Sequence, residues 1–253
     1  MGGSAPVRSG ARASYDTIGV NYSDLRKPDT RIGAAIERAL GLAKTVLNVG
    51  AGAGSYEPAG RRVTAVEPSA EMIGQRRDAA ARVVQGRAEN LPFGDDSFDA
   101  SMAVLTVHHW TDKAKGLREM RRVTRGPVVV LTFDPAHRGF WLADYLPELV
   151  ALDDVQMPRI TDYGAWLGSV EISAVPVPHD CTDGFLYAYW RRPAAYLDPG
   201  IRAAMSSFWI LGDVSEGLER LAGDLDTGAW AQRYADLLDR HEYDAGYRLV
   251  TTT

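Results

Sequence analysis

The residues best suited to chemistry are a cluster of glycines and an acid that follows them. Gly50, Gly52 and Gly54 come directly after the apolar run TVLNV. Glycine has no Cβ, so such a turn between a strand and a helix lets a ligand contact the backbone itself. Glu67 ends the next apolar run, and Pro68 stops that strand. A carboxylate in this position can accept hydrogen bonds from both hydroxyl groups of a ribose.

Two classes of ligand fit this pattern, a dinucleotide and a nucleoside-containing methyl donor. The dinucleotide fingerprint is G-x-G-x-x-G with an acid about 20 residues later. In this chain the third glycine comes one position early, Ser55 stands in its place, and Glu67 follows closely. A short-chain dehydrogenase also needs a Tyr-x-x-x-Lys pair, and no lysine follows a tyrosine at that spacing. The spacing therefore counts against a nicotinamide dehydrogenase.

The segments around these residues alternate between strand and helix. Apolar runs typical of buried parallel strands occupy residues 45–50, 63–66, 81–86, 98–107 and 126–134. Helical patterns occupy residues 28–41, a segment capped by Ser69, and residues 111–124. This alternation predicts a parallel sheet with helices on both faces. Ligands of such sheets bind beyond the carboxyl ends of the strands, where Gly50 and Glu67 are expected.

The alternation ends after Asp134. The next residues are rich in aromatic side chains, a sixth strand disturbed by proline is predicted within SVEISAVPVPHD, and YRLVTTT is predicted as a last strand beside it. Two further segments, LDPGIRAAMSSFWIL and LERLAGDLDTGAWAQRYADLLDRH, are predicted to be helical. The prediction is an α/β, Rossmann-like, doubly wound and mostly parallel seven-stranded sheet with a helical insertion after strand five.

The whole chain is predicted to form a single domain behind a short leader. The predicted parts are a flexible leader (1–13), a cofactor-binding core (14–134), a partly helical substrate-side region (135–212) and a C-terminal helix and strand (213–253).

Composition restricts the classes of partner. The 253 residues are 45% hydrophobic and 24% charged, as in globular domains, and carry a net charge of −5 without a basic block. Nucleic acid is therefore not expected as a partner. Cys181 is the single cysteine, which suits a reducing cytoplasm. The chain offers neither an apolar run near the ~20 residues of a membrane span nor a metal-ligand spacing. We predict a cytoplasmic protein without a metal, and the sequence leaves its oligomeric state open.

Four ordered segments resemble a known family. VLNVGAGAGSYEP, VTAVEPSAEMI, GRAENLPFGDDSFDASMAVLTVHHW and REMRRVTRGPVVVLTFDP resemble successive motifs of class I S-adenosylmethionine-dependent methyltransferases. The nearest group is the small-molecule type that includes the ubiquinone and menaquinone biosynthesis enzymes. The resemblance runs from about Tyr15 to Asp134 and implies S-adenosylmethionine (SAM) as cofactor. The remaining residues match no substrate motif.

The resemblance implies roles for individual residues. The glycine turn is expected to line the methionine part of SAM, Glu67 to hold the ribose, Met72 to pack on the adenine edge, and Leu105 to lie near the methionine end. Core packing remains open for Met72, and a solvated loop position remains open for Glu89. The residues expected to bind the cofactor are Gly50, Ala51, Gly52, Glu67, Pro68, Met72, Ala88, Glu89, Leu105, Tyr22 and Arg26.

Two features modify this expectation. Asn48 stands where family members usually have Asp, and the lost charge predicts weaker binding of the cationic cofactor. The segment SYDTIGVNYSDLRKPD resembles the helical lid of the same group. This implies that Tyr15, Tyr22 and Arg26 fold over the cofactor, with Arg26 pairing with the cofactor's carboxylate. An exposed helix face is the alternative for the lid.

Methyl transfer to a hydroxyl, an amine or an electron-rich ring can use a base. His108 and His109 follow the fourth strand, and His179 follows the sixth. Some relatives pair an N-terminal tyrosine with a histidine, which would bring in Tyr15 or Tyr22. Purely structural roles for the histidines remain open.

The aromatic side chains beyond Asp134 predict a core and, in part, a pocket wall. We expect a small aromatic or hydrophobic acceptor, methylated at O, N or C, as in secondary metabolism. The alternatives are a macromolecule (RNA or protein) methyltransferase and a catalytically silent cofactor-binding protein.

Overall fold

The computed structural model describes residues 26–76 and 81–253. The predicted leader and most of the predicted lid, with Tyr15 and Tyr22, lie outside the described residues.

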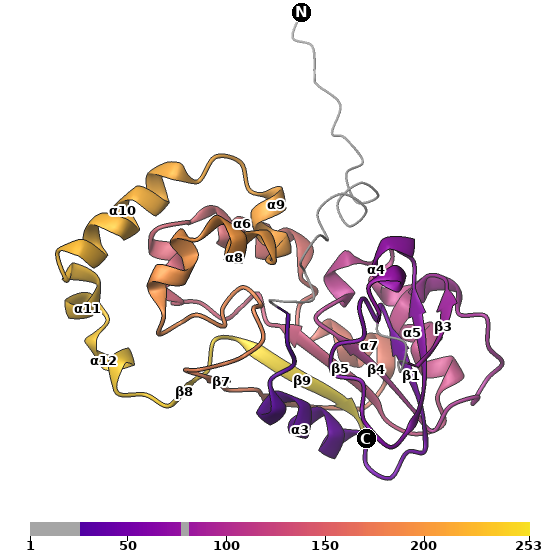
Figure 1. Cartoon of the computed structure of the whole chain (residues 1–253). Coiled ribbons are helices and arrows are strands. Elements are labelled where there is room, and N and C mark those ends of the chain that lie inside the picture. The colour runs from indigo at the N-terminus through magenta and orange to yellow at the C-terminus, as the bar shows by residue number, and fades with distance from the viewer. Residues whose placement is uncertain (1–25, 77–80) are drawn as a thin grey trace, which may run out of the picture.

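One mixed sheet organises the fold (Figure 1). Its seven strands run in the order β3-β2-β1-β4-β5-β9-β6. The first five strands pair in parallel, and β9 is antiparallel to both β5 and β6. This confirms the predicted mostly parallel, Rossmann-like sheet with the last strand beside the sixth. The strands are β1 (Thr45–Val49), β2 (Arg62–Glu67), β3 (Arg82–Gln85), β4 (Ala100–Val104), β5 (Val128–Phe133), β6 (Val170–Ala174) and β9 (Tyr247–Thr252).

Helices cover both faces of the sheet. Helix α3 (Thr30–Ala39) begins at Asp29, whose side chain accepts the Arg31 N–H, and buries Ile32 and Ile36 in one hydrophobic cluster. Helices α5 (Lys113–Val123) and α7 (Asp162–Leu167) contribute to a second cluster on the other face of the sheet. Alternate strand residues reach it, such as Leu47, whereas its neighbour Val46 belongs to the first cluster. The strands are therefore apolar on both faces because both faces are covered.

The segment after β1 differs from the prediction. The glycine turn was expected to lead into a helix, but turns and irregular backbone occupy residues 50–60. Pro58 and Gly60 interrupt the segment, and Tyr56 has a φ of 62°, so a helix cannot continue through it. The next helix, α4 (Ala70–Gly74), is capped by Ser69 as predicted. The glycine turn is thus held by its own contacts and not by a following helix.

The sixth predicted strand is split by its prolines. Its first part is β6 in the main sheet. Its second part, β7 (Val177–Pro178), pairs with β8 (Glu242–Tyr243) in a separate two-stranded sheet.

The insertion after β5 is a group of short helices beside the sheet (Figure 1). The two predicted long helices are broken: the first is interrupted at Ala204 and Met205, and the second at Gly228, which has a φ of 77°. Across residues 26–76 and 81–253, none of the helices is long and apolar enough to cross a membrane. The elements are η4 (Trp141–Asp144), α6 (Glu148–Gln156), η5 (Pro193–Leu197), α8 (Pro199–Ala203), α9 (Ser206–Ile210), α10 (Ser215–Asp226), α11 (Ala229–Arg233) and α12 (Ala235–Leu238).

Candidate active site

The glycine turn lies at the carboxyl ends of β1 and β2. The N–H groups of Gly50 and Ala51 both donate to the Val66 carbonyl, at 2.8 and 3.1 Å. Gly50 has a φ of 68°, and a Cβ at this position would lie 2.2 Å from Oγ1 of Thr106. Only glycine fits that backbone conformation and that space. The turn therefore packs directly against the segment that follows β4.

Glu67 lies beside this turn, as predicted. The residue is 7% exposed, and its carboxylate accepts the N–H groups of Gly52 at 2.8 Å and Ser69 at 3.0 Å. Burial raises its pKa, although the two backbone hydrogen bonds and the charge of Arg76 act in the opposite direction. Each oxygen accepts one of these N–H groups, and a carboxylate has about four acceptor sites. The carboxylate retains capacity for the two hydroxyls of a ribose.

The predicted adenine-side residues occupy neighbouring positions. Met72 is buried, and its Cε lies 3.3 Å from the position of a Cβ built on Gly52. Ala88 is buried in the 3-10 turn η2 (Ala88–Asn90). Oε1 of Glu89 accepts the N–H groups of Thr111 and Asp112, at 2.8 and 3.1 Å. Glu89 thus holds the loop that leads into α5. Its predicted contact with adenine remains a prediction, as does the role of the exposed Pro68.

Sequence reasoning missed an ion pair next to Asn48. The Asn48 side chain donates to Glu57 at 3.1 Å, and Glu57 pairs with Arg76 at 2.6 Å. Arg76 also donates to the Gly52 carbonyl at 3.1 Å, and its side chain is only 3% exposed. A carboxylate is therefore present beside Asn48, but the charge of Arg76 balances it. In the sequence, the polar side chain of Asn48 within an apolar strand was the signal that a polar partner such as Glu57 lies nearby.

The end of β4 carries a strained residue. Leu105 has a φ of 50°, in the left-handed region that residues with a side chain seldom adopt. Its N–H donates to the Leu131 carbonyl at 2.9 Å, which holds the strand end in place. Strain of this kind persists where the surrounding structure imposes it, often at ligand sites. Leu105 lines a pocket, next to the residues predicted to bind SAM.

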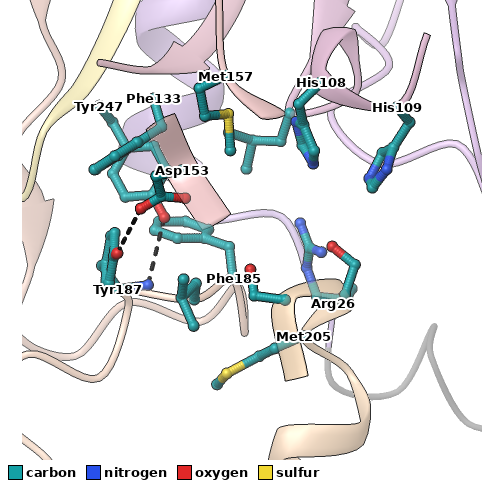
Figure 2. Close-up of a pocket in the computed structure, with 14 residues that line it drawn as sticks. Arg26, His108, His109, Phe133, Asp153, Met157, Phe185, Tyr187, Met205 and Tyr247 are labelled. Carbon is teal, nitrogen blue, oxygen red and sulfur yellow. Dashed lines mark hydrogen bonds between the residues drawn. The ribbon is translucent and has the colours of Figure 1, made fainter. Parts of the chain in front are cut away.

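His108 and His109 line the same pocket (Figure 2). They lie in the 3-10 turn η3 (Val107–His109), and their ring centroids are 3.8 Å apart. Burial, with the charges of Arg26 and Lys113, lowers the pKa of His109 to about 4. Burial and its charged neighbours likewise lower the pKa of His108 well below its usual value. Both imidazoles are neutral at neutral pH.

Arg26 enters the pocket but has an acidic partner. Its Nε donates to Asp183 at 2.5 Å, and Asp183 is 1% exposed. The Tyr56 hydroxyl donates to the same carboxylate at 3.0 Å and accepts the Asp29 N–H at 3.2 Å. This contact joins the glycine-turn segment to the loop after β7. The predicted pairing of Arg26 with the cofactor remains a prediction.

The far side of the pocket comes from the insertion and the last strand (Figure 2). Asp153 of α6 is 3% exposed and accepts the Tyr187 hydroxyl at 2.9 Å. The sequence did not single out Asp153. Aromatic and apolar side chains complete this wall: Phe133, Met157, Phe185, Leu186, Met205 and Tyr247.

His179 is not among the residues that line this pocket. Its backbone N–H donates to the His241 carbonyl at 2.9 Å, and its Nδ1 lies 3.1 Å from the Arg191 guanidinium. The structure thus brings His108, His109 and Arg26 together and places His179 beside the two-stranded sheet.

The fold and the site define the class. A parallel sheet with a glycine turn and a ribose-type acid at its carboxyl edge is a nucleoside-binding arrangement. Residues 47–130 match the family model described as "Methyltransferase domain". Over most of its length, the chain is similar to the crystal structure of a candidate methyltransferase from an antibiotic biosynthesis pathway of Anabaena variabilis. The identity is 37%, the TM-score is 0.86, and the match covers 91% of this chain and 100% of the other.

The chain therefore belongs to the class I S-adenosylmethionine-dependent methyltransferases, as the sequence resemblance predicted. It is also 29% identical over 108 residues to the rice 2-methyl-6-phytyl-1,4-hydroquinone methyltransferase 2. This match covers 41% of this chain and 30% of that protein. The chain thus spans less than a third of this curated relative.

A likeness in fold alone links the chain to a structure with a bound cofactor product. This is the geranyl diphosphate C-methyltransferase of Streptomyces coelicolor A3(2), in complex with S-adenosyl-L-homocysteine (SAH). The identity is 16%, the TM-score is 0.52, and the match covers 88% of this chain and 78% of the other. SAM is the cofactor of the family, and the arrangement of Gly52, Glu67 and Met72 fits it.

Proposed function

We propose that this protein transfers the methyl group of SAM to a small aromatic or hydrophobic acceptor. The acceptor would bind in the pocket lined by Leu105, His108 and His109, just beyond the end of β4. The observation that carries the proposal is the pocket itself. It adjoins the predicted methionine end of the cofactor site at Leu105 and is walled by aromatic side chains. When bound, SAM supplies a methyl group on a sulfonium, and the protein has to align a nucleophile with it.

The chain's own residues support three tasks in this proposal. The glycine turn and Glu67 bind the cofactor, and Leu105 fixes the end of β4 beside it. The aromatic wall, with Phe133 and Phe185, holds an apolar acceptor and excludes water. The neutral imidazole of His108 or His109 can accept a hydrogen bond from the acceptor's nucleophilic atom. With a pKa of about 4, His109 is a weak base, so positioning is its better role.

The test is the formation of SAH with a panel of acceptors. Purified protein is incubated with SAM and with phenols, indoles, hydroquinones and simple amines, and SAH and methylated products are measured together. We expect SAH formation that depends on an aromatic or apolar acceptor. Turnover confined to small charged acceptors, or to RNA or protein, would contradict the proposal. SAH binding without turnover of any acceptor would indicate a silent binder.

A control separates catalysis from binding. His109→Asn keeps a polar side chain of similar reach, and we expect it to lower the turnover number while SAH affinity changes little. Lys27→Ala, at an exposed position at the start of the described chain, serves as the surface control.

A further inference from the structure

The pocket contains a buried acid that the methyl-transfer proposal does not use. Asp153 is 3% exposed and lines the pocket, whereas the next residue, Asp154, is half exposed and pairs with Arg138 at 2.6 Å. Within residues 26–76 and 81–253, the Tyr187 hydroxyl is the one donor that reaches the Asp153 carboxylate. Buried carboxylates are costly unless they are paired, so this one has hydrogen-bonding capacity without a matching donor.

Several aromatic rings line the pocket together with this carboxylate. The ring of Phe133 lies 5.1 Å from that of Tyr187 and 5.7 Å from that of Tyr247, measured between centroids. The ring of Phe185 lies 4.6 Å from that of Tyr247. A carboxylate next to several aromatic rings is the usual environment for an organic cation, which gains from the charge and from the ring faces.

The acid lies away from the two histidines. Figure 2 shows Asp153 and Tyr187 on one side of the pocket, and His109 with Arg26 on the other. The methylated atom is expected on the histidine side, because Leu105 and η3 follow β4 there. A group bound by Asp153 is therefore at a distance from the methylated atom.

We propose that Asp153, Tyr187, Phe133 and Tyr247 form a recognition site for a protonated amine on the acceptor, remote from the atom that is methylated. The inference rests on the proposed function and narrows its substrate class to aromatic or hydrophobic molecules with an ammonium group. Asp153 supplies the negative charge, Tyr187 orients its carboxylate, and the rings contact the carbon atoms next to the nitrogen.

The charged surroundings of Asp153 give the site a pH dependence. Burial raises the pKa of Asp153 to about 6, opposed by the Tyr187 hydrogen bond and the charge of Arg138, while Asp154 raises it further. The Tyr247 hydroxyl faces the same space and remains protonated, because burial raises its pKa. Affinity for an ammonium group should fall as the pH decreases through about 6, because protonation removes the charge that binds it.

Three probes that differ only in their end group test this proposal. Tyramine, 4-propylphenol and 3-(4-hydroxyphenyl)propanoate carry a cation, a methyl group and an anion on the same phenol. Binding to the SAH-saturated protein is measured by calorimetry at about pH 7.5 and pH 5. We expect tyramine to bind about tenfold or more tightly than 4-propylphenol at the higher pH, the anion to bind most weakly, and the preference for tyramine to shrink at pH 5.

Matched variants locate the effect. Asp153→Asn should remove the preference for tyramine, whereas Asp154→Asn, on the same helix, should keep it. Tyr187→Phe retains the charge and should move the loss of tyramine binding to a higher pH, because the hydrogen bond that lowers the pKa is gone. The wild-type comparison of the three probes needs no variant to fold.

Equal or weaker binding of tyramine than of 4-propylphenol would overturn the proposal, as would a preference that survives Asp153→Asn. Binding of none of the probes to protein that still binds SAH would also overturn it. A protein that does not bind SAH at all would instead contradict the proposed function, so the two failures can be told apart.

Discussion

The two sides of the site are built in different ways. On the predicted cofactor side, backbone groups make most of the contacts: the turn at Gly50 and Gly52, and the N–H groups that hold Glu67. On the acceptor side, side chains from distant segments meet, as in the contact of Asp153 with Tyr187. A site made of backbone is fixed by a few neighbouring residues. A site made of side chains depends on how whole elements pack.

The largest expected effect lies on the cofactor side. Gly50→Ala places a Cβ against Thr106 in a left-handed backbone conformation, and should lower the free energy of unfolding by about 3 kcal/mol or more. Denaturant unfolding measures this loss. Gly60→Ala is the matched control, since Gly60 also has a positive φ (79°) but no atom within 4 Å, so only the conformational cost of about 1–2 kcal/mol remains. Equal losses in the two variants would show that the packing against Thr106 is unimportant.

On the acceptor side, replacing the buried acid Asp153 should raise the free energy of unfolding at neutral pH instead of lowering it. The pKa of Asp153 is raised from 3.8 to about 6, so the folded state binds this proton more tightly than the unfolded state does. Its contribution to stability is most favourable below about pH 4 and is lost as the pH rises through about 6. At neutral pH the ionised group costs up to about 3 kcal/mol, from the shift at 1.36 kcal/mol per pH unit.

Asp153→Asn should therefore raise the free energy of unfolding at pH 7.5 by about 1–3 kcal/mol, with little gain near pH 4. Denaturant unfolding of both proteins at the two pH values measures the difference. A destabilised variant at pH 7.5 would show that the carboxylate has a structural role that burial and the single Tyr187 contact do not reveal.

Loss of the hydrogen bond between Tyr56 and Asp183 should have an intermediate effect on the free energy of unfolding. Tyr56→Phe removes the hydroxyl that donates to Asp183 and accepts the Asp29 N–H. The expected loss of stability is about 1–3 kcal/mol, because buried polar groups lose a partner. A double-mutant cycle with Asp183→Asn measures the coupling. Additive losses would contradict a direct link between the glycine-turn segment and the loop after β7.

The smallest effect is expected at His179. It pairs with Arg191 beside the two-stranded sheet and does not line the pocket. His179→Asn should leave kcat/KM within about threefold of the wild type, because its side chain does not line the pocket. A loss of a hundredfold would return His179 to the list of catalytic residues.

The sequence predicted the cofactor side better than the acceptor side for a physical reason. Strand periodicity and the position of Glu67 at a strand end follow from local patterns, so the place of Glu67 beside the glycine turn could be predicted. The roles of Gly52, Glu67 and Met72 toward the cofactor remain predictions. The missing helix after β1 was not foreseen, although Pro58 and Gly60 were visible.

The acceptor side could not be predicted in the same way. Asp153 and Asp154 are adjacent acids in one helix, yet one is buried and the other is half exposed. Which of them faces the pocket depends on Tyr187, which lies in a different segment of the chain. Asp153 lies four residues after the buried Leu149, on the same face of the helix, but the exposed Val155 shows that the apolar pattern alone does not mark this face, which is set by tertiary packing.

We expect the Glu67 carboxylate to bind the ribose of SAM at the carboxyl edge of the sheet, and calorimetric titration with SAH measures this contact. Wild-type protein and Glu171→Ala, an exposed acid on β6, should bind SAH equally well. Glu67→Ala should weaken binding by about 30-fold or more, because two ribose hydrogen bonds to a buried charge are lost, while its unfolding remains cooperative. An unchanged dissociation constant in a folded Glu67→Ala protein would show that Glu67 does not bind the ribose.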